Sequence, residues 1–171
     1  MARRGFTMVE VVIVVAIIVV LVAVGYPVTR GVLERAHRTQ CLGKLREIGV
    51  GLDLYLADHG DRFPEIAMAG SAPGEELTLE GVLREYVAGP DVFHCPADRK
   101  LFKQTGSSYL WNSTQSGRHK LRTSFFGVEG RPEQVPLVTD KEAFHGDPNG
   151  VNMLYADYHL TNKVEFRAGP R

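Results

Sequence analysis

The most unusual chemical feature of the sequence is a carboxylate, Glu10, at the start of a long apolar segment. Residues 11–25 contain no polar side chain, and Arg3 and Arg4 precede the segment. A charge placed among lipid-compatible residues costs about 2.5–3.5 kcal/mol on insertion scales, so such a group usually has a partner and a function. Glu10 is therefore the first candidate functional residue of the chain.

The apolar segment has the length of a membrane-spanning helix. Counted from Phe6, it is about 20 residues long, which is enough for a helix to cross a hydrocarbon core. A plain signal peptide cleaved near residues 23–25 also fits the basic start and the apolar run, but it has no use for Glu10. An uncleaved membrane anchor in which Glu10 occurs by chance is a further alternative.

The residues around Glu10 resemble the N-terminus of the type IV pilin superfamily, which includes the pseudopilins of type II secretion. In that family a membrane peptidase cuts a short basic leader after a Gly and before a Phe, and the new N-terminus is methylated. A Glu five residues into the mature chain then serves assembly. Gly5, Phe6 and Glu10 match these positions, and Pro27 matches a proline near the end of the family's membrane segment.

The physical chemistry of Glu10 agrees with this resemblance. Cleavage after Gly5 would expose the amine of Phe6 as a positive charge at the membrane. A carboxylate about one helical turn away could meet that amine on a neighbouring copy of the chain. In a low dielectric an unpaired carboxylate is penalised and a paired one is not, so the pair would set the register between subunits.

The expected fold class is α+β and pilin-like, with a long N-terminal helix and a small antiparallel sheet. The second half of the helix should be amphipathic, with one buried stripe that comprises Cys41, Leu45, Ile48, Leu52 and Tyr55. Pro27 is expected to bend the helix near the membrane boundary. We predict four parts: a leader (1–5), a transmembrane assembly helix (6–27), an amphipathic helix (28–59) and a globular head (60–171).

The head should contain a short helix followed by strands. Gly60 and Pro64 are expected to end the long helix, and an apolar pattern predicts a short helix over 79–87. Pro136 indicates an edge strand. The predicted strands are 108–111, 121–126, 135–139 and a hairpin of 151–155 with 159–166.

The two cysteines of the chain, Cys41 and Cys95, are candidates for a disulfide. Cys41 lies on the predicted buried stripe, and Cys95 lies in a loop that must pack back on the helix. A disulfide would stabilise the chain by about 2–4 kcal/mol and would require an oxidising compartment. Two separate buried thiols remain the alternative. A catalytic Cys95 beside His94 is disfavoured, because neighbours in sequence do not form a dyad.

Two further resemblances concern the head. The stretch 55–64 resembles the exit from the long helix in G-type pseudopilins. The C-terminal part resembles a pilin-like group marked by a His, nine residues and then Asp-Gly. This chain departs from that signature, because eleven residues separate His145 from Asp157 and Tyr158 replaces the Gly. A Tyr is unfavourable at a positive φ, so the resemblance leaves the geometry of this turn open.

The sequence predicts no cofactor, with calcium as the one candidate. G-type pseudopilins carry a calcium site in their C-terminal loops, although residues 147–150 also form a good turn without any ion. The histidines lack the close spacing of zinc ligands: His94, His119, His145 and His159. The calcium candidates are Asp140, Asp147, Asn149 and Asp157.

Composition and motifs argue for assembly and against catalysis. The formal net charge is zero, which gives no electrostatic case for nucleic acid as a partner. No nucleophile–base or paired-carboxylate pattern supports a membrane-tethered enzyme. The resemblance implies four partners: a prepilin peptidase, other copies and pilin-like subunits, an inner-membrane assembly platform and the lipid bilayer.

The resemblance also implies a location. It predicts a single-pass protein of the bacterial inner membrane, with a cytoplasmic N-terminus and a periplasmic head. The positive-inside rule favours the opposite orientation, but processing of the leader on the cytoplasmic face takes precedence. Two functions stay open: a pseudopilin of a type II secretion system, or a type IV pilin or envelope pilin-like protein outside secretion.

Overall fold

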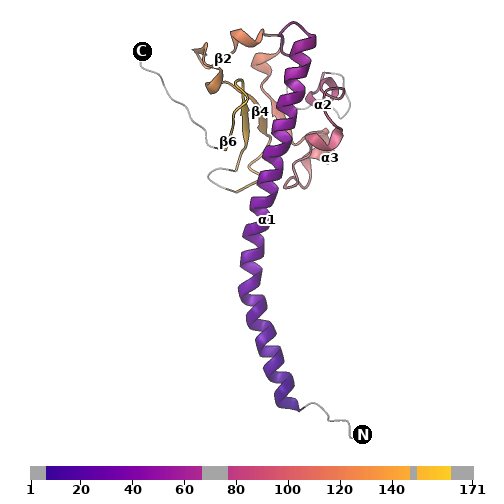
Figure 1. Ribbon diagram of the computed structural model, residues 1–171, viewed down its shortest axis with the longest axis vertical. Helices are drawn as coiled ribbons and strands as arrows, with labels where there is room; N and C mark the ends of the chain where they lie inside the picture. Colours follow the sequence, from indigo (N-terminus) through magenta and orange to yellow (C-terminus); the bar gives the residue numbers. More distant parts are fainter. Residues whose placement is uncertain (1–6, 67–76, 147–149, 163–171) are drawn as a thin grey trace. The chain divides into compact units, whose positions relative to one another are not determined.

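The computed structural model describes residues 7–66, 77–146 and 150–162 (Figure 1). The chain divides into two compact units, Met1–Ala36 and His37–Arg171. The helix α1 (Met8–Asp58) contributes residues to both units. The predicted α+β, pilin-like fold class is confirmed by this helix and by an antiparallel sheet in the second unit.

The first unit contains the apolar part of α1. Its large side chains are exposed, with Leu21 at 66% and Ile13 at 54%. By length and composition alone, α1 is long and apolar enough to cross a membrane. A helix satisfies its own backbone hydrogen bonds, which is the condition for crossing a bilayer.

Pro27 lies within α1, and the helix continues through it. The side chain of Pro27 is outside the described residues, so the predicted bend stays a prediction. The expected boundaries at residues 5, 27 and 59 also stay predictions, apart from the end of α1 at Asp58. Gly60 has φ 61°, and the amide of Asp61 donates to the carbonyl of Leu56 at 2.8 Å. This is the glycine cap that the sequence predicts at the end of the helix.

In the second unit, one stripe of α1 forms a wall of the core. Tyr55, which the sequence predicts in this stripe, is only half-buried, and its ring stacks on the exposed His59 with centroids 3.8 Å apart. Leu56, which follows it, is buried instead. The stripe therefore comprises Cys41, Leu45, Ile48, Leu52 and Leu56, each at most 1% exposed.

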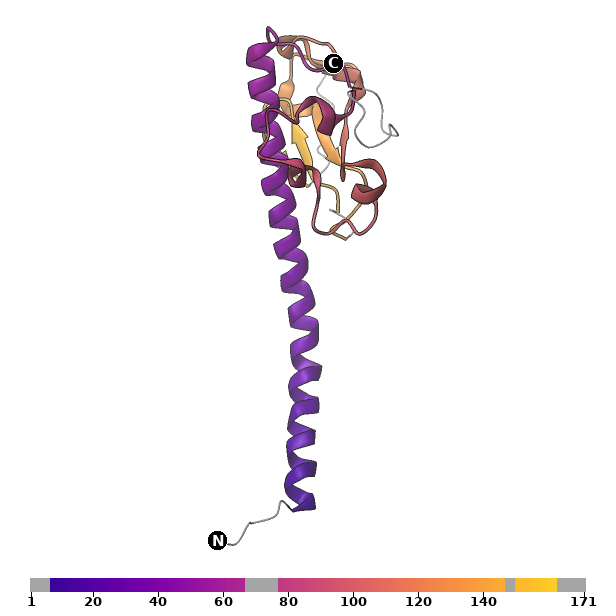
Figure 2. The same cartoon turned by 90° about the vertical axis from the view of Figure 1, so that its right-hand side faces the viewer.

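A four-stranded antiparallel sheet lies beside this part of α1 (Figure 2). Its order is β1-β4-β5-β6. The strand β4 is therefore interior, and the prediction that Pro136 marks an edge strand is wrong. Pro136 is the first residue of β4, where the pairing register with β5 shifts, so its missing N–H breaks no regular ladder. The strands are β1 (Tyr109–Trp111), β4 (Pro136–Asp140), β5 (Met153–Tyr155) and β6 (Leu160–Thr161).

Short elements complete the head. The predicted helix over 79–87 is shorter, and the predicted strand over 121–126 begins as a 3-10 turn because the His119 side chain caps it. The predicted C-terminal hairpin is confirmed as β5 and β6, and residues 163–166 lie outside the described residues. The other elements are α2 (Leu79–Val82), η1 (Pro90–Phe93), α3 (Leu101–Thr105), η2 (Ser113–Gln115), η3 (Lys120–Arg122), β2 (Ser124–Phe125), β3 (Val128–Glu129) and η4 (Pro132–Gln134).

Two glycines of α1 allow close packing in this unit. A Cβ atom on Gly51 would lie 2.7 Å from Cγ1 of Val87 and 3.2 Å from the carbonyl oxygen of Tyr86. A Cβ on Gly49 would press on the side chain of Leu154 at 3.3 Å. These positions let the chain after α2 and the strand β5 approach the helix backbone.

Gly51→Ala should therefore destabilise the head by about 1–3 kcal/mol, because overpacking outweighs the gain in helix propensity. Gly43→Ala is the matched control, since a Cβ there has no neighbour within 4 Å. It should stabilise the helix by up to about 1 kcal/mol. Chemical unfolding of both variants in detergent measures the difference, and equal effects would contradict the close packing at Gly51.

Candidate functional site

The candidate assembly residue Glu10 sits in the first turn of α1. The backbone N–H and the hydroxyl of Thr7 both donate to Oε2 of Glu10, each at 2.9 Å. The N–H of Glu10 in turn lies 3.3 Å from the hydroxyl of Thr7. This reciprocal arrangement is a capping box, in which a Thr and a Glu three residues later satisfy each other's backbone donors.

The capping box explains how α1 begins and where it holds its charge. A carboxylate near a helix N-terminus is favoured by the helix dipole. Sequence reasoning singled out Glu10 but missed Thr7, although Thr-x-x-Glu before an apolar run is a recognisable start signal. The predicted cleavage site at Gly5 and Phe6 lies outside the described residues.

The apolar side chains that follow Glu10 form a continuous exposed surface on α1. Along residues 8–24 the large hydrophobic side chains are at least half exposed. An exposed apolar surface of this extent marks contact with a membrane or with another protein.

In the head, the structure joins Cys41 and Cys95 in a disulfide that closes a span of 54 residues. Their Cα atoms are 5.1 Å apart, and both residues are fully buried. The bond ties α1 to the loop before α3. His94, the neighbour of Cys95 in sequence, faces away from it: its Nε2 lies 3.4 Å from the carbonyl oxygen of Asp98, and its ring stacks on Phe102.

The loop that carries Cys95 is held by a buried carboxylate. Asp98 accepts hydrogen bonds from the N–H groups of Lys100, Leu101 and Phe102 at 2.7–2.9 Å. It also accepts one from the Ser108 hydroxyl at 2.6 Å. Burial acts to raise the pKa of Asp98, but the bonds from Ser108 and the three amides outweigh it and lower that pKa.

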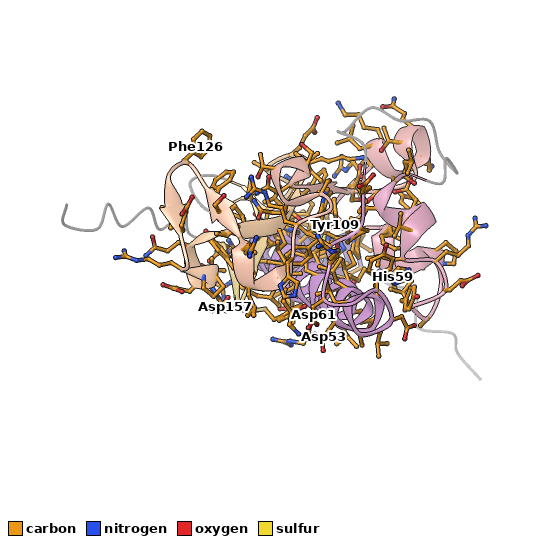
Figure 3. The ribbon with its side chains drawn as sticks, turned by 90° about the horizontal axis from the view of Figure 1, so that it is seen from above. Asp53, His59, Asp61, Tyr109, Phe126 and Asp157 are labelled. Carbon is orange, nitrogen blue, oxygen red and sulfur yellow. A yellow bond between two sulfur atoms is a disulfide. The ribbon has the colours of Figure 1, made fainter. Side chains whose placement is uncertain are left out.

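Ser108 links the same carboxylate to the disulfide. Its hydroxyl oxygen accepts a hydrogen bond from the N–H of Cys95 at 3.0 Å. The next residue, Tyr109, is 1% exposed and lies among the interior side chains (Figure 3). Its hydroxyl donates to the carbonyl of Cys41 at 3.5 Å, and burial raises the pKa of Tyr109. Both ends of the disulfide are thus bonded to β1 or the residue before it.

A buried histidine and carboxylate lie beside the disulfide. Nε2 of His145 is 3.5 Å from Sγ of Cys95 and 3.8 Å from Oδ2 of Asp140. The hydrogen bonds that Asp140 accepts from Asn152 act to lower its pKa, but burial outweighs them and raises the pKa of Asp140 to about 7. Both contacts fall on one ring nitrogen, so this is not the geometry in which a carboxylate orients a catalytic His–Cys pair. No local pattern in the sequence indicates that His145, 50 residues from Cys95, reaches it.

The described calcium candidates do not form one cluster. Asp140 is bonded to Asn152, just before β5 begins, whereas Asp157 follows the end of β5 and is bonded to His159. Asp157 lies at the periphery in Figure 3. The two carboxylates are therefore attached at opposite ends of β5 (Met153–Tyr155). Asp147 and Asn149 lie outside the described residues, and calcium binding stays a prediction.

The turn between β5 and β6 contains Tyr158, the residue that departs from the Asp-Gly signature. Tyr158 has φ 66°, in the left-handed region that favours glycine. Its ring contacts the helix at Gly49, and its hydroxyl donates to Oδ1 of Asp53 at 3.3 Å. The turn left open by the sequence is therefore formed, and these contacts offset the cost of the strained backbone.

Intact protein from membranes should contain no free thiol under denaturing, non-reducing conditions. Reduction should lower the free energy of unfolding by about 2–4 kcal/mol, because it frees a long loop in the unfolded chain. Thiol titration and unfolding with and without reductant measure both effects. Two free thiols in protein that was never reduced would contradict the bridge.

Asp98→Ala should destabilise the head by about 1–3 kcal/mol, because it leaves buried N–H groups without an acceptor. Asp98→Asn keeps an acceptor and should cost less. Since the folded pKa of Asp98 lies below its usual 3.8, its stabilisation is present above pH 3.8 and lost as the pH falls through the folded value. Wild type should therefore lose more stability in acid than Asp98→Asn, and parallel acid profiles would count against this network.

The comparisons with known proteins extend these observations. A family described as "Prokaryotic N-terminal methylation motif" matches residues 1–26. The chain is 29% identical over 131 residues to the "Type II secretion system core protein G" of Pectobacterium carotovorum subsp. carotovorum, covering 76% of this chain and 79% of that protein. It is also 29% identical over 132 residues to the protein of that name from Klebsiella pneumoniae, covering 77% and 89%.

No solved structure gives a significant match. The methylation motif covers the segment that holds Glu10, and the two similarities extend over most of the chain. These findings support the superfamily of type IV pilins and pseudopilins for this chain.

Proposed function

We propose that this chain is a pseudopilin of a type II protein secretion system, a filament subunit drawn from the inner membrane. The observation that carries the proposal is the similarity to core protein G over about three quarters of the chain, head included. The methylation motif at residues 1–26 supports processing between Gly5 and Phe6 with methylation of Phe6. A prepilin peptidase would be the processing partner.

Assembly would use the charge that the capping box holds in the first turn of α1. After cleavage, Thr7 would be the second residue of the mature chain, and its bonds to Glu10 would keep the carboxylate at the start of the helix. The amine of Phe6 on a neighbouring copy would then meet a carboxylate of fixed position. Pairing removes the penalty for an isolated charge in an apolar environment.

The exposed apolar side chains of α1 would face lipid in the membrane and other copies of the helix in a filament. The membrane would serve as a reservoir of subunits, and an inner-membrane platform would move them into the filament. The head would be periplasmic. A disulfide in the head supports an oxidising compartment. This observation runs against the positive-inside rule, by which the excess of basic residues after the apolar segment favours the opposite orientation.

This work would be assembly without catalysis. Among the described residues, Cys95 and His145 come nearest to a nucleophile and a base, but the sulfur is in a disulfide. A second function remains of interest: a type IV pilin or envelope protein of the His/Asp-Gly group. The left-handed conformation of Tyr158 favours it, because the chain keeps the turn geometry that a Gly would supply.

The first experiment is intact mass measurement with N-terminal sequencing of the protein from membranes. A chain that begins at Phe6 and carries one added methyl group is expected. A start at Met1 would leave a simple anchor, and a start near Tyr26 would indicate a secreted protein. Deletion of the gene should also block export of type II substrates, whereas intact export would favour the second function.

Glu10→Val should insert into the membrane but fail to assemble, because the amine of the neighbouring copy loses its partner. Thr7→Val should lower filament yield less, since it removes the hydroxyl bonds but keeps the backbone bond to Glu10. Thr7→Ser is the matched control and should assemble like wild type. Membrane fractionation and the yield of sheared filaments give the two measurements, and a wild-type yield from Glu10→Val would refute the pairing.

A further inference from the structure

We propose that the reduced chain holds a zinc-class divalent metal ion through Cys41, Cys95 and His145, with Asp140 as the fourth ligand. Formation of the disulfide would exclude the ion. The head would thus have two alternative cross-links at one place, a metal centre when its cysteines are reduced and a covalent bond when they are oxidised.

The positions of the ligand atoms carry the proposal. The sulfurs of Cys41 and Cys95 and a ring nitrogen of His145 all lie within 4.8 Å of one another, and all three residues are buried. A tetrahedral zinc ion with Zn–S near 2.3 Å and Zn–N near 2.0–2.1 Å requires about 3.5 Å between sulfur and nitrogen. The observed distance from Sγ of Cys95 to Nε2 of His145 is 3.5 Å.

Asp140 provides an independent observation. Its Oδ1 is buried and has no hydrogen-bond partner among the described residues. Its Oδ2 accepts bonds from the backbone and side-chain N–H groups of Asn152 at 2.8 and 2.9 Å, and lies 3.8 Å from Nε2 of His145. A buried, unsatisfied carboxylate oxygen is costly. Coordination of the metal ion would satisfy Oδ1 of Asp140. Asn152, which is not a ligand, would orient the Asp140 carboxylate through its two hydrogen bonds.

To form this centre the two sulfur atoms must separate, and the carboxylate of Asp140, 3.8 Å from Nε2 of His145, must approach the ion. The sulfurs are bonded to each other in the disulfide, whereas two thiolates on one tetrahedral zinc ion are about 3.8 Å apart. Rotation of the two side chains about their Cα–Cβ bonds can supply this change. The ion would then replace the disulfide as the link between α1 and the loop that carries Cys95.

The exchange is balanced in atoms and charge. A dithiol or phosphine reductant supplies two electrons, and two protons from water complete the two thiols. Binding of one Zn²⁺ releases both protons, leaving two thiolates and a neutral His145 on the ion. A disulfide oxidant removes two electrons from the thiolates, forms the S–S bond and frees the ion.

The test uses the full chain in detergent, reduced with a phosphine and titrated with Co²⁺. Thiolate-to-cobalt absorption and the intense visible bands of a tetrahedral ion should saturate at one ion per chain, and Zn²⁺ should displace them. Oxidised chain should show neither signal. Zn²⁺ should also protect both cysteines of the reduced chain from alkylation, which requires no variant.

Variants separate this centre from a simple pair of thiols. His145→Ala should lose the tetrahedral spectrum, and Asp140→Asn should weaken Zn²⁺ binding because it removes a charged ligand. His94→Ala is the matched control and should bind like wild type, because His94 faces the carbonyl of Asp98. Each variant is first compared with wild type in its oxidised form to establish that it folds.

Three results would overturn the proposal: no tetrahedral spectrum from reduced wild type, equal binding by His145→Ala, or equal binding by oxidised chain. If His145→Ala does not fold even when oxidised, the alkylation of wild type decides. Modification at the same rate with and without Zn²⁺ would then refute the centre.

Discussion

The head depends on the burial of one stripe of α1 against the sheet. The stripe places fully buried side chains at a helical spacing, and the sheet supplies Leu137, Val138 and Leu154 to the same core. Each such side chain contributes about 1.5–3 kcal/mol when it is removed from water. Gly49 and Gly51 matter because a Cβ would crowd the side chain of Leu154 at the first position and would lie only 2.7 Å from Val87 at the second.

Buried polar interactions add to this apolar packing. The disulfide, Asp98, Ser108 and Tyr109 form one connected group that fastens the loop before α3 to the helix and to β1. Every member is buried, so each bond is made in a low dielectric, where a missing partner is expensive. Such a group gives the head one arrangement of its loops where apolar packing alone would permit several.

The same dielectric argument applies to the first turn of α1. A carboxylate at the edge of an apolar segment needs partners, and Thr7 provides them within one chain. The capping box bonds to Oε2 of Glu10. It holds the charge in place, which reduces the conformational freedom that such a pairing would otherwise remove.

The sequence by itself determined the features that depend on local chemistry. The apolar run, the carboxylate, the buried stripe of α1, the glycine cap at Gly60 and the final hairpin follow from periodicity and turn residues. Tertiary structure decided what depends on residues far apart in the chain. It made β4 an interior strand despite Pro136, it ended the buried stripe at Leu56, and it brought His145 to Cys95. Long-range packing sets these outcomes, because strand order and the approach of a loop to a helix depend on which buried surfaces fit together, and neither spacing nor propensity records that fit.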